Sequence, residues 1–306
     1  MSTDRKPVQW CEENRAHFEG TLSFGEGLSK HTYYRIGGPA QIFCIPKSVA
    51  DLQWIQELIA QTSVRYFILG LGSNILVADA GFAGLVIKTS RIDISIGLTG
   101  TLLRVGSGVA VSSLLRRAAL EGWSGFEMLT GVPGSMGGVI TMNAGTHLGE
   151  AKDRIRRVET YHLGTGATRV IEGSELRFEY RKNLFLDPAE VITHSEWEIT
   201  LSEPAKVKVV IDETLARRKA SQPTEYPSCG SVFKNPQGIH AWQVIEKLQL
   251  RGYRIGNAQI SEKHPNFIVN LGGALASDVK ELIELVKARA QAELGVEMHE
   301  EVKFLG

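Results

Sequence analysis

The chain has 306 residues, of which 43% are apolar and 22% charged, a composition typical of a globular protein with two or three compact units. Its 34 basic and 34 acidic residues cancel, so no net field favours a nucleic acid or an anionic membrane. No apolar run approaches the roughly 18 residues of a membrane helix, and the amino terminus lacks the apolar core of a signal peptide. We therefore expect a cytoplasmic protein with no nucleic-acid partner and no membrane insertion.

The first third of the chain predicts a β-α-β unit. After a short helix near residues 11–18, an apolar strand is expected at 41–45. A helix follows, with Ser48 as its N-cap and apolar residues at helical spacing. Strands at 66–69 and 84–88 complete the unit.

Short strands dominate the middle third. They are expected at residues 92–96, 102–105, 157–162, 168–171 and 191–201. One amphipathic helix interrupts them, beginning near Val111 and ending at Gly122. We expect a second α+β unit whose glycine turns face those of the first.

The last third predicts a small α+β unit. A helix opened by Pro204 ends in the basic run 217–219, where cations complement the negative end of the helix dipole. A second helix is expected at 242–250, a strand at 267–271 and a third helix capped by Ser277.

Cysteine and histidine usage predicts neither a disulfide framework nor a metal site. The three cysteines are far apart, and the eight histidines lack any ligand spacing. Cys44 and Cys229 are expected to pack as small apolar residues rather than to react as thiols.

Two glycine-rich loops favour a bound nucleotide. Residues 129–145, LTGVPGSMGGVITMNAG, hold five glycines and no charge, so backbone N–H groups are available to a phosphate or diphosphate. A second Gly/Ser-rich turn at 70–74 follows an expected strand, where α/β proteins place ligands. Neither loop matches the Rossmann or P-loop fingerprint. A buried turn that binds nothing is the alternative for each loop taken alone.

Three further segments place a polar group in surroundings that restrain it. Arg181 follows an aromatic residue and presents a planar fork suited to a carboxylate or enolate, although a surface arginine is the commoner case. Ser231 lies on a proline-bracketed loop, which suits a positioned proton donor or an ordinary strand-loop junction. Glu301 opens an alternating strand that could turn it inward while Glu300 faces solvent, or it belongs to a solvated acidic run.

Taken together, segments spread over nearly the whole chain resemble the UDP-N-acetylenolpyruvoylglucosamine reductase family, MurB. They occur in family order: HTYYRIGGPA at 31–40, ILGLGSNIL at 68–76, GFEMLTGVPGSMGGVITMNAG at 125–145, FEYRKNLF at 178–185, YPSCGSVFKNP at 226–236, ISEKHPNFIVN at 260–270 and EEVKFLG at 300–306. One such segment alone is a weak signal, but all of them in register are highly specific.

The resemblance implies the α+β FAD-binding fold of the vanillyl-alcohol oxidase (PCMH) type. FAD-binding subdomains at 1–88 and 89–203 would clasp the cofactor, and a substrate-binding α+β domain would occupy 204–306. The residues that would lie near FAD are Gly70, Leu71, Gly72, Ser73, Asn74, Gly131, Pro133, Gly134, Ser135, Gly137, Gly138, Asn143, Ala144 and Gly145.

The resemblance also implies an oxidoreductase, a UDP-N-acetylmuramate dehydrogenase of peptidoglycan and cell-wall synthesis, and thereby of cell shape and cell division. NADPH would reduce FAD, and flavin N5 would deliver hydride to C3 of the enolpyruvyl ether of UDP-N-acetylglucosamine. Arg181 and Glu301 would stabilise the enolate, and Ser231 would protonate C2. Substrate-binding roles would fall to Tyr180, Lys219, Lys234 and Asn235.

The spacing of the matched segments resembles the shorter, second type of the family. Only 50 residues separate Arg181 from Ser231, which leaves little room for the loop insertion of the longer type. We expect a monomer. Two other functions stay open: a different flavin oxidase on the same fold, and a nucleotide-sugar-binding protein without catalysis. The joint presence of Arg181, Ser231 and Glu301 favours the reductase over both.

Overall fold

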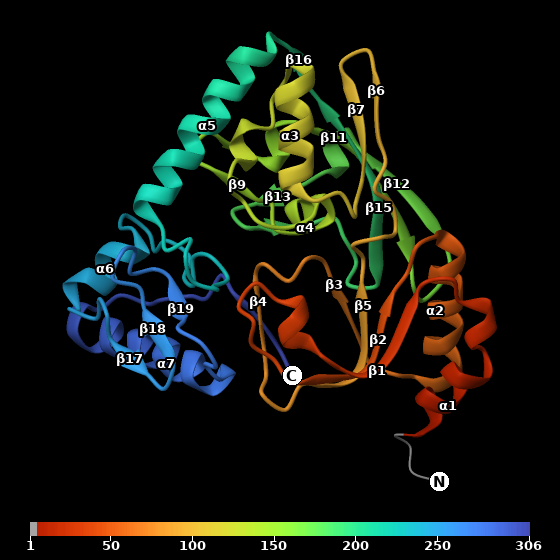
Figure 1. Ribbon diagram of the computed structural model, residues 1–306, viewed down its shortest axis with the longest axis horizontal. Helices are drawn as coiled ribbons and strands as arrows, with labels where there is room; N and C mark the ends of the chain where they lie inside the picture. Colours follow the sequence, from red (N-terminus) through yellow and green to blue (C-terminus); the bar gives the residue numbers. More distant parts are fainter. Residues whose placement is uncertain (1–4) are drawn as a thin grey trace. The chain divides into compact units, whose positions relative to one another are not determined.

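A computed structural model describes residues 5–306, and Figure 1 shows their helices and strands. The chain forms two compact units, and each is assembled from separated segments. The first unit takes in residues up to 25, 41–71 and 84–215, and the second takes in 26–40, 72–83 and 216–306. The division into three domains at residues 88 and 203 stays a prediction.

A four-stranded sheet with two helices forms the predicted β-α-β unit (Figure 1). In sheet order its strands are β1 (Thr21–Gly27), β2 (Pro39–Ile45), β5 (Phe82–Lys88) and β3 (Tyr66–Leu69), and its helices are α1 (Arg5–Glu13) and α2 (Val49–Thr62). Strands β3 and β5 pair in parallel, and residues 70–81 connect them, whereas α2 connects β2 to β3. As predicted, the Ser48 Oγ accepts the Asp51 N–H at 3.2 Å and caps α2.

The first helix begins earlier than predicted. Helix α1 ends at Glu13, and the expected span 11–18 continues instead as a 3-10 turn at Arg15–His17. Cys11 is fully buried in a cluster with Leu52 and Ile55 of α2, because α1 turns its few apolar side chains toward that helix. The polar sequence around them hid this periodicity.

A five-stranded antiparallel sheet carries the rest of the first unit. Its order is β12 (Thr168–Glu172), β11 (Ile155–His162), β15 (Glu190–Glu198), β7 (Leu102–Gly106) and β6 (Ile96–Thr99). Helix α3 (Val111–Glu121) ends at Gly122, as predicted, with that glycine at φ +72°. Trp197 and Phe126 are almost fully buried and pack with their ring centres 5.7 Å apart in the core of this layer.

Two of the predicted strands are wrong in extent. The strand expected at 92–96 is β6, at Ile96–Thr99, because the Asp93 carboxylate accepts the Ser95 N–H and turns the chain before it. The strand expected at 191–201 ends at Glu198 and resumes as a two-residue strand.

Short elements connect these layers. They are β8 (Trp123–Ser124), which pairs with β16 (Thr200–Leu201); β9 (Gly145–Thr146), which pairs with β10 (Gly149–Glu150); β13 (Phe178–Glu179), which pairs with β14 (Lys182–Asn183); and α4 (Met136–Thr141). The predicted helix opened by Pro204 is α5 (Pro204–Ser221), which has Arg218 and Lys219 of the basic run in its last turn.

The second unit has its own core between two helices and a small sheet. Its elements are β17 (Arg254–Ile255), β18 (Ala258–Ile260), β19 (Ile268–Asn270), α6 (Ala241–Lys247), α7 (Ala276–Leu294), and the parallel pair β4 (Ile75–Val77) and β20 (Lys303–Leu305). Helix α6 is shorter than the predicted 242–250, because Gln249 adopts a left-handed φ of +55° just beyond it.

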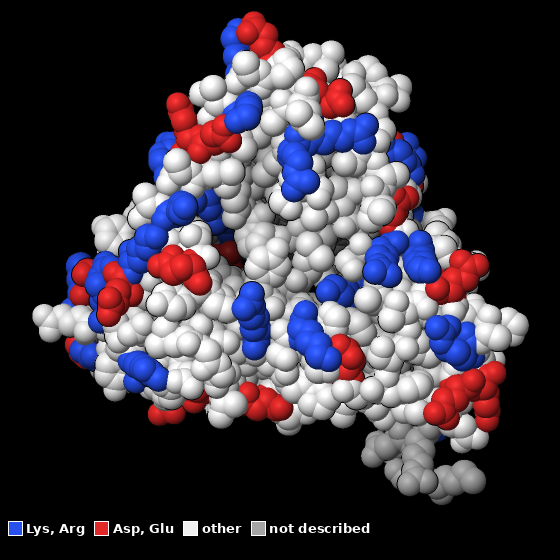
Figure 2. Space-filling view, viewed as in Figure 1, with Lys and Arg blue, Asp and Glu red and all other residues white. Residues whose placement is uncertain are grey.

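Charges of both signs are intermixed on the face shown in Figure 2. Many of these groups pair locally. On the five-stranded sheet, Arg104 donates two hydrogen bonds of 2.8 Å to Glu159, and these bonds hold the pKa of that carboxyl below its usual value.

Helix α7 is capped by two aspartates, not by Ser277 as predicted. The helix begins at Ala276, so Ser277 lies inside its first turn. The Asp79 carboxylate accepts the N–H groups of Ala276 at 2.6 Å and Ser277 at 3.0 Å, and Asp278 accepts the Leu275 N–H at 3.0 Å. Desolvation acts to raise the pKa of Asp79, but these N–H donors lower it below the ordinary value.

Replacing Asp79 by alanine should therefore destabilise the second unit by about 1 kcal/mol at pH 7. Since the pKa of Asp79 is lowered by folding, its contribution is present above the unfolded-state pKa and is lost as pH falls through the folded value. Urea denaturation should show that the difference in the free energy of unfolding between wild type and Asp79→Ala is smaller below about pH 4 than at pH 7. Ser277→Ala is the comparison: it removes only the side chain that also hydrogen-bonds Asp79, so it should destabilise less. An equal loss of stability in it would contradict capping of the backbone N–H groups by Asp79.

Candidate active site

The glycine-rich stretch 129–145 is a loop followed by the short helix α4, and not a turn between two strands. Gly134 has a φ of +135°, a conformation that a residue with a Cβ rarely adopts. The Met136 N–H donates to the Val109 carbonyl at 2.9 Å. The loop is thus held by backbone hydrogen bonds to the turn that precedes α3.

Two other glycines lie close to serine side chains. A Cβ on Gly70 would lie 3.1 Å from the Ser135 Oγ, and a Cβ on Gly137 would lie 3.2 Å from the Ser107 Cβ. Gly70 thus faces the second glycine-rich loop across a narrow gap, as the sequence predicts for the two glycine turns.

Three buried hydroxyl groups at this loop have no hydrogen-bond partner among residues 5–306: Ser107, Thr130 and Ser135. Ser135 occupies the N-cap position of α4, yet its side chain makes no capping bond. A buried hydroxyl without a partner costs about 1–3 kcal/mol, so an external acceptor would stabilise the loop. Phosphate oxygens are such acceptors, and the residues present therefore fit the diphosphate of FAD. Sequence reasoning identified Ser135 but missed Ser107 and Thr130, which the glycine pattern alone does not mark.

The first glycine-rich loop, 70–74, crosses from one unit to the other after Leu71. In the second unit Gly72 has a φ of +70°, and a Cβ there would lie 2.1 Å from the His31 carbonyl oxygen. The Asn74 side chain donates to the Glu301 carbonyl at 3.0 Å. Asn74, predicted to lie near FAD, is therefore bonded to the C-terminal segment.

Arg181 lies at the tip of a hairpin between β13 and β14, with a φ of +58° that is uncommon for a residue with a side chain. Its guanidinium donates to the carbonyls of Asn143 at 3.5 Å and Gly145 at 3.3 Å. The same group lies 5.1 Å from the centre of the Tyr180 ring. The arginine is therefore oriented by the end of the glycine-rich stretch, and is not a freely solvated surface residue.

The fully buried Asn143 fastens this hairpin to the glycine-rich stretch. Its side-chain amide donates to the Glu150 carboxylate at 3.0 Å and to the Glu179 carbonyl at 3.1 Å, and its oxygen accepts the Lys152 N–H at 3.1 Å. The amide is thus engaged by protein groups on both sides. The role of Asn143 beside FAD stays a prediction.

Ser231 and Glu301 attach to the same backbone segment of the second unit. Ser231 is half-buried and directly precedes Val232, whose carbonyl accepts the Glu301 N–H at 2.8 Å. Gly230, with a φ of +83°, allows the turn into this segment. The structure thus brings these two predicted residues together, whereas Arg181 belongs to the other unit.

Glu300 does not simply face solvent, as the alternation predicted. Its carboxylate pairs with the Lys287 ammonium at 2.7 Å. Desolvation acts to raise the pKa of Glu300, and the hydrogen bond from Lys287 lowers it below the usual value. The pair ties the C-terminal segment to α7.

The residues predicted to bind substrate differ in their exposure and in their hydrogen bonds. Tyr180 is 46% exposed, and Lys219 lies exposed in the last turn of α5. The Lys234 N–H donates to the His299 carbonyl at 2.9 Å, and the Asn235 side-chain oxygen accepts the Ala241 N–H at 3.1 Å. Asn235 therefore supports the start of α6.

Cys229 is a packed residue, as predicted. It is 4% exposed, and burial raises the pKa of its thiol to about 12. A neutral thiol at physiological pH is a poor nucleophile. Cys44 is likewise fully buried, and burial raises its pKa well above the ordinary value.

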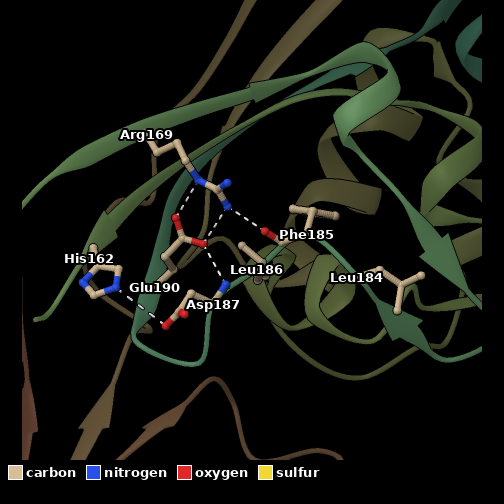
Figure 3. Close-up of a pocket in the computed structure, with 7 residues that line it drawn as sticks. All are labelled: His162, Arg169, Leu184, Phe185, Leu186, Asp187 and Glu190. Atoms are coloured by element: carbon tan, nitrogen blue, oxygen red, sulfur yellow. Dashed lines mark hydrogen bonds and ion pairs between the residues drawn. The ribbon is translucent and has the colours of Figure 1, made fainter.

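A separate pocket opens on the five-stranded sheet (Figure 3), lined by His162, Arg169, Leu184, Phe185, Leu186, Asp187 and Glu190. Arg169 donates two hydrogen bonds of 2.8 Å to the Glu190 carboxylate and one of 2.6 Å to the Phe185 carbonyl. Desolvation acts to raise the pKa of Glu190, but Arg169 and the Asp187 N–H lower it. The charges in this pocket satisfy one another, and none of the predicted site residues lines it.

Within residues 5–306, no group of three or more His, Cys, Asp or Glu side chains is arranged to hold a metal ion. Over the same part of the chain, no helix has the length and apolar character needed to cross a membrane.

Two protein families match the chain. The FAD binding domain family matches residues 40–171, the range that contains both glycine-rich loops. The C-terminal domain family of UDP-N-acetylenolpyruvoylglucosamine reductase matches residues 222–305, the range that contains Ser231 and Glu301.

Relatives match along almost the whole chain. The UDP-N-acetylenolpyruvoylglucosamine reductase of Heliobacterium modesticaldum is 39% identical over 290 residues, which are 94% of this chain and 92% of that protein. The enzyme of the same name from Carboxydothermus hydrogenoformans is 38% identical over 295 residues, 96% of this chain and 97% of that protein.

A solved structure supports the same conclusion. The crystal structure of the reductase (MurB) from Thermus caldophilus is 34% identical, with a TM-score of 0.78, and covers 94% of this chain and 99% of its own. The predicted α+β FAD-binding fold of the vanillyl-alcohol oxidase type is thereby confirmed. The chain is an oxidoreductase that belongs to the UDP-N-acetylenolpyruvoylglucosamine reductase family.

Proposed function

We propose that this chain reduces the enolpyruvyl ether of UDP-N-acetylglucosamine to UDP-N-acetylmuramate, with FAD as its bound cofactor and NADPH as its hydride donor. The observation that carries the proposal is the 39% identity over 290 residues to a reductase of that name, with Arg181, Ser231 and Glu301 at their motif positions. The enzyme would act as a cytoplasmic monomer in peptidoglycan synthesis.

The two glycine-rich loops would hold the FAD diphosphate. At Gly70 and Gly137, which have no Cβ, the backbone lies close to the side chains of Ser135 and Ser107. The hydroxyls of Ser107, Thr130 and Ser135 would donate to phosphate oxygens. When bound, FAD supplies the redox centre that passes a hydride from NADPH to the substrate.

Arg181 would stabilise negative charge on the substrate enolate, with help from Glu301. Two backbone carbonyls and the Tyr180 ring hold its guanidinium in place before substrate arrives. Such an oriented cation lowers a barrier more than a mobile one, because no reorganisation is needed as charge develops.

Ser231 would deliver a proton to C2 of the substrate. A serine hydroxyl is a weak acid, so geometry matters more than its pKa, and Gly230 and Val232 restrict where the hydroxyl can lie. Tyr180, Lys219 and Lys234 would bind the substrate. Asn235 would use its NH₂ group, since its oxygen holds the Ala241 N–H.

The first test is anaerobic stopped-flow absorbance of the FAD-loaded protein. Mixing with NADPH should bleach the flavin bands, and UDP-N-acetylglucosamine enolpyruvate should restore them. Bleaching without return would favour a different flavin oxidoreductase. Absence of any flavin absorbance after reconstitution would favour a nucleotide-sugar-binding protein without catalysis.

Removing the Ser135 hydroxyl should weaken FAD binding. Ser135→Ala deletes one of the buried donors, and a hydrogen bond to a charged group is worth about 1.5–3 kcal/mol, so the Kd for FAD should rise roughly tenfold or more. Fluorescence titration of the apoprotein with FAD measures it. Ser113→Ala, on the exposed face of α3, is the control and should leave the Kd unchanged. An unaltered Kd in Ser135→Ala would remove that hydroxyl from the diphosphate.

Ser231→Ala should separate the two half-reactions. NADPH should still bleach the flavin at the wild-type rate, while colour return with the enolpyruvyl ether should slow roughly 100-fold or more, because the proton donor is lost. Stopped-flow absorbance follows both phases. Ser228→Ala, in the same loop, is the matched control, and normal colour return in Ser231→Ala would show that another group protonates C2.

Arg181→Lys should impair the same second half-reaction, the reoxidation of the flavin by substrate. A lysine ammonium cannot replace the planar fork held by two carbonyls, so colour return should slow roughly 100-fold while bleaching by NADPH persists. The exposed Arg177→Lys provides the comparison for a surface arginine on the same segment. Wild-type turnover in Arg181→Lys would exclude a role at the enolate.

A further inference from the structure

We propose that Asn266 is a positioning residue for this reaction. Its buried amide hydrogen-bonds both backbone polar groups of Phe233 and thereby fixes the positions of Ser231 and Glu301 relative to each other. The inference rests on the proposed function of these two residues. It assigns a role to the segment 260–270, to which the proposed mechanism gives none.

The amide of Asn266 pairs with both polar groups of one residue. Its Oδ1 accepts the Phe233 N–H at 3.0 Å, and its Nδ2 donates to the Phe233 carbonyl at 2.9 Å. The Asn266 backbone carbonyl also accepts the Val232 N–H at 2.8 Å. Asn266 is 4% exposed, so water does not compete for these bonds.

The other side of the same dipeptide holds the C-terminal segment. The Val232 carbonyl accepts the Glu301 N–H at 2.8 Å, and Phe233 forms an isolated bridge with Glu300. Residues 232 and 233 thus lie between two other segments. They are hydrogen-bonded to Asn266 on one side and to Glu301 on the other, and Ser231 directly precedes them.

The side chain is needed because the backbone here has too few partners of its own. Val232 and Phe233 are buried but belong to no regular strand, so their polar groups depend on individual hydrogen bonds. Without the amide, the N–H and carbonyl of Phe233 would both seek new partners. Ser231 and the carbonyl that holds Glu301 would shift with them, and a misplacement of about 1 Å can cost roughly 100-fold in rate.

Asn270 offers a matched control on the same segment. It is also 4% exposed, and its amide donates to the Tyr34 carbonyl at 2.9 Å while its oxygen accepts the Gly272 and Ala274 N–H groups. It therefore makes an equally buried clamp whose side-chain partners lie outside residues 231–235 and 299–303. Loss of either amide should disturb the fold to a similar degree, but only loss of Asn266 should disturb the site.

The experiment compares wild type, Asn266→Ala and Asn270→Ala as full-length, FAD-loaded proteins. In Asn266→Ala, bleaching by NADPH should stay within about twofold of wild type, and colour return with UDP-N-acetylglucosamine enolpyruvate should slow roughly 10- to 100-fold, with little change in KM. Asn270→Ala should leave both phases near wild type. Asn266→Asp keeps the acceptor for the Phe233 N–H but loses the donor, and it replaces Asn266→Ala if that variant does not fold.

Amide hydrogen exchange supplies a readout independent of turnover. In either Asn266 variant, peptides covering 231–236 and 299–306 should exchange faster together, whereas Asn270→Ala should leave both protected. Faster exchange with unchanged colour return would overturn the positioning role, as would equal slowing of colour return in Asn270→Ala. Wild type that fails to regain colour would overturn the proposed function and the positioning role with it. Unchanged exchange in both peptides would overturn the claim that the Asn266 amide holds these segments, and would leave the proposed function standing.

Discussion

Buried asparagine amides satisfy the backbone of the irregular segments from which the candidate site is built. Loops rich in glycine and proline cannot pair their own N–H and carbonyl groups as helices and ladders do, yet those groups must find partners once buried. Asn143 does this for the Arg181 hairpin in one unit, and Asn266 and Asn270 do it in the other. Each amide supplies a donor and an acceptor from one side chain, so it can replace a short piece of ladder.

This arrangement connects rigidity with chemistry. A group that is to meet developing charge or deliver a proton must be held before the reaction begins. Arg181 is held by carbonyls at the end of the glycine-rich stretch, and Ser231 and Glu301 adjoin one dipeptide. The hydroxyls of Ser107, Thr130 and Ser135 in the first unit differ, because they find no acceptor among residues 5–306, which supports the proposal that a bound ligand supplies one. Positions that bind a ligand can thus differ from positions that shape the site.

Much of the secondary structure could be predicted from sequence, because the signals are local. The Ser48 cap, the strand before Gly70 and the Gly122 helix end all follow from residue type and spacing. The errors arose where a distant partner decides the local conformation. Ser277 seemed a suitable cap, yet α7 begins earlier, with the Asp79 carboxylate brought to it from a remote segment. Helix α4 was missed because its glycines conceal a helical pattern.

The sequence by itself determined the family, the FAD-binding fold and the identity of the candidate residues, because motif order and glycine placement are properties of the chain. Only the tertiary structure decided what each motif residue touches. Asn143 and Asn235, expected beside ligands, use their side chains on protein backbone, while Ser107 and Thr130 have hydroxyls without a hydrogen-bond partner in the described part of the chain. Asn266 had no assigned role until the fold brought it against Phe233. Hydrogen-bond partners far apart in sequence depend on how the segments pack, and no local pattern records that.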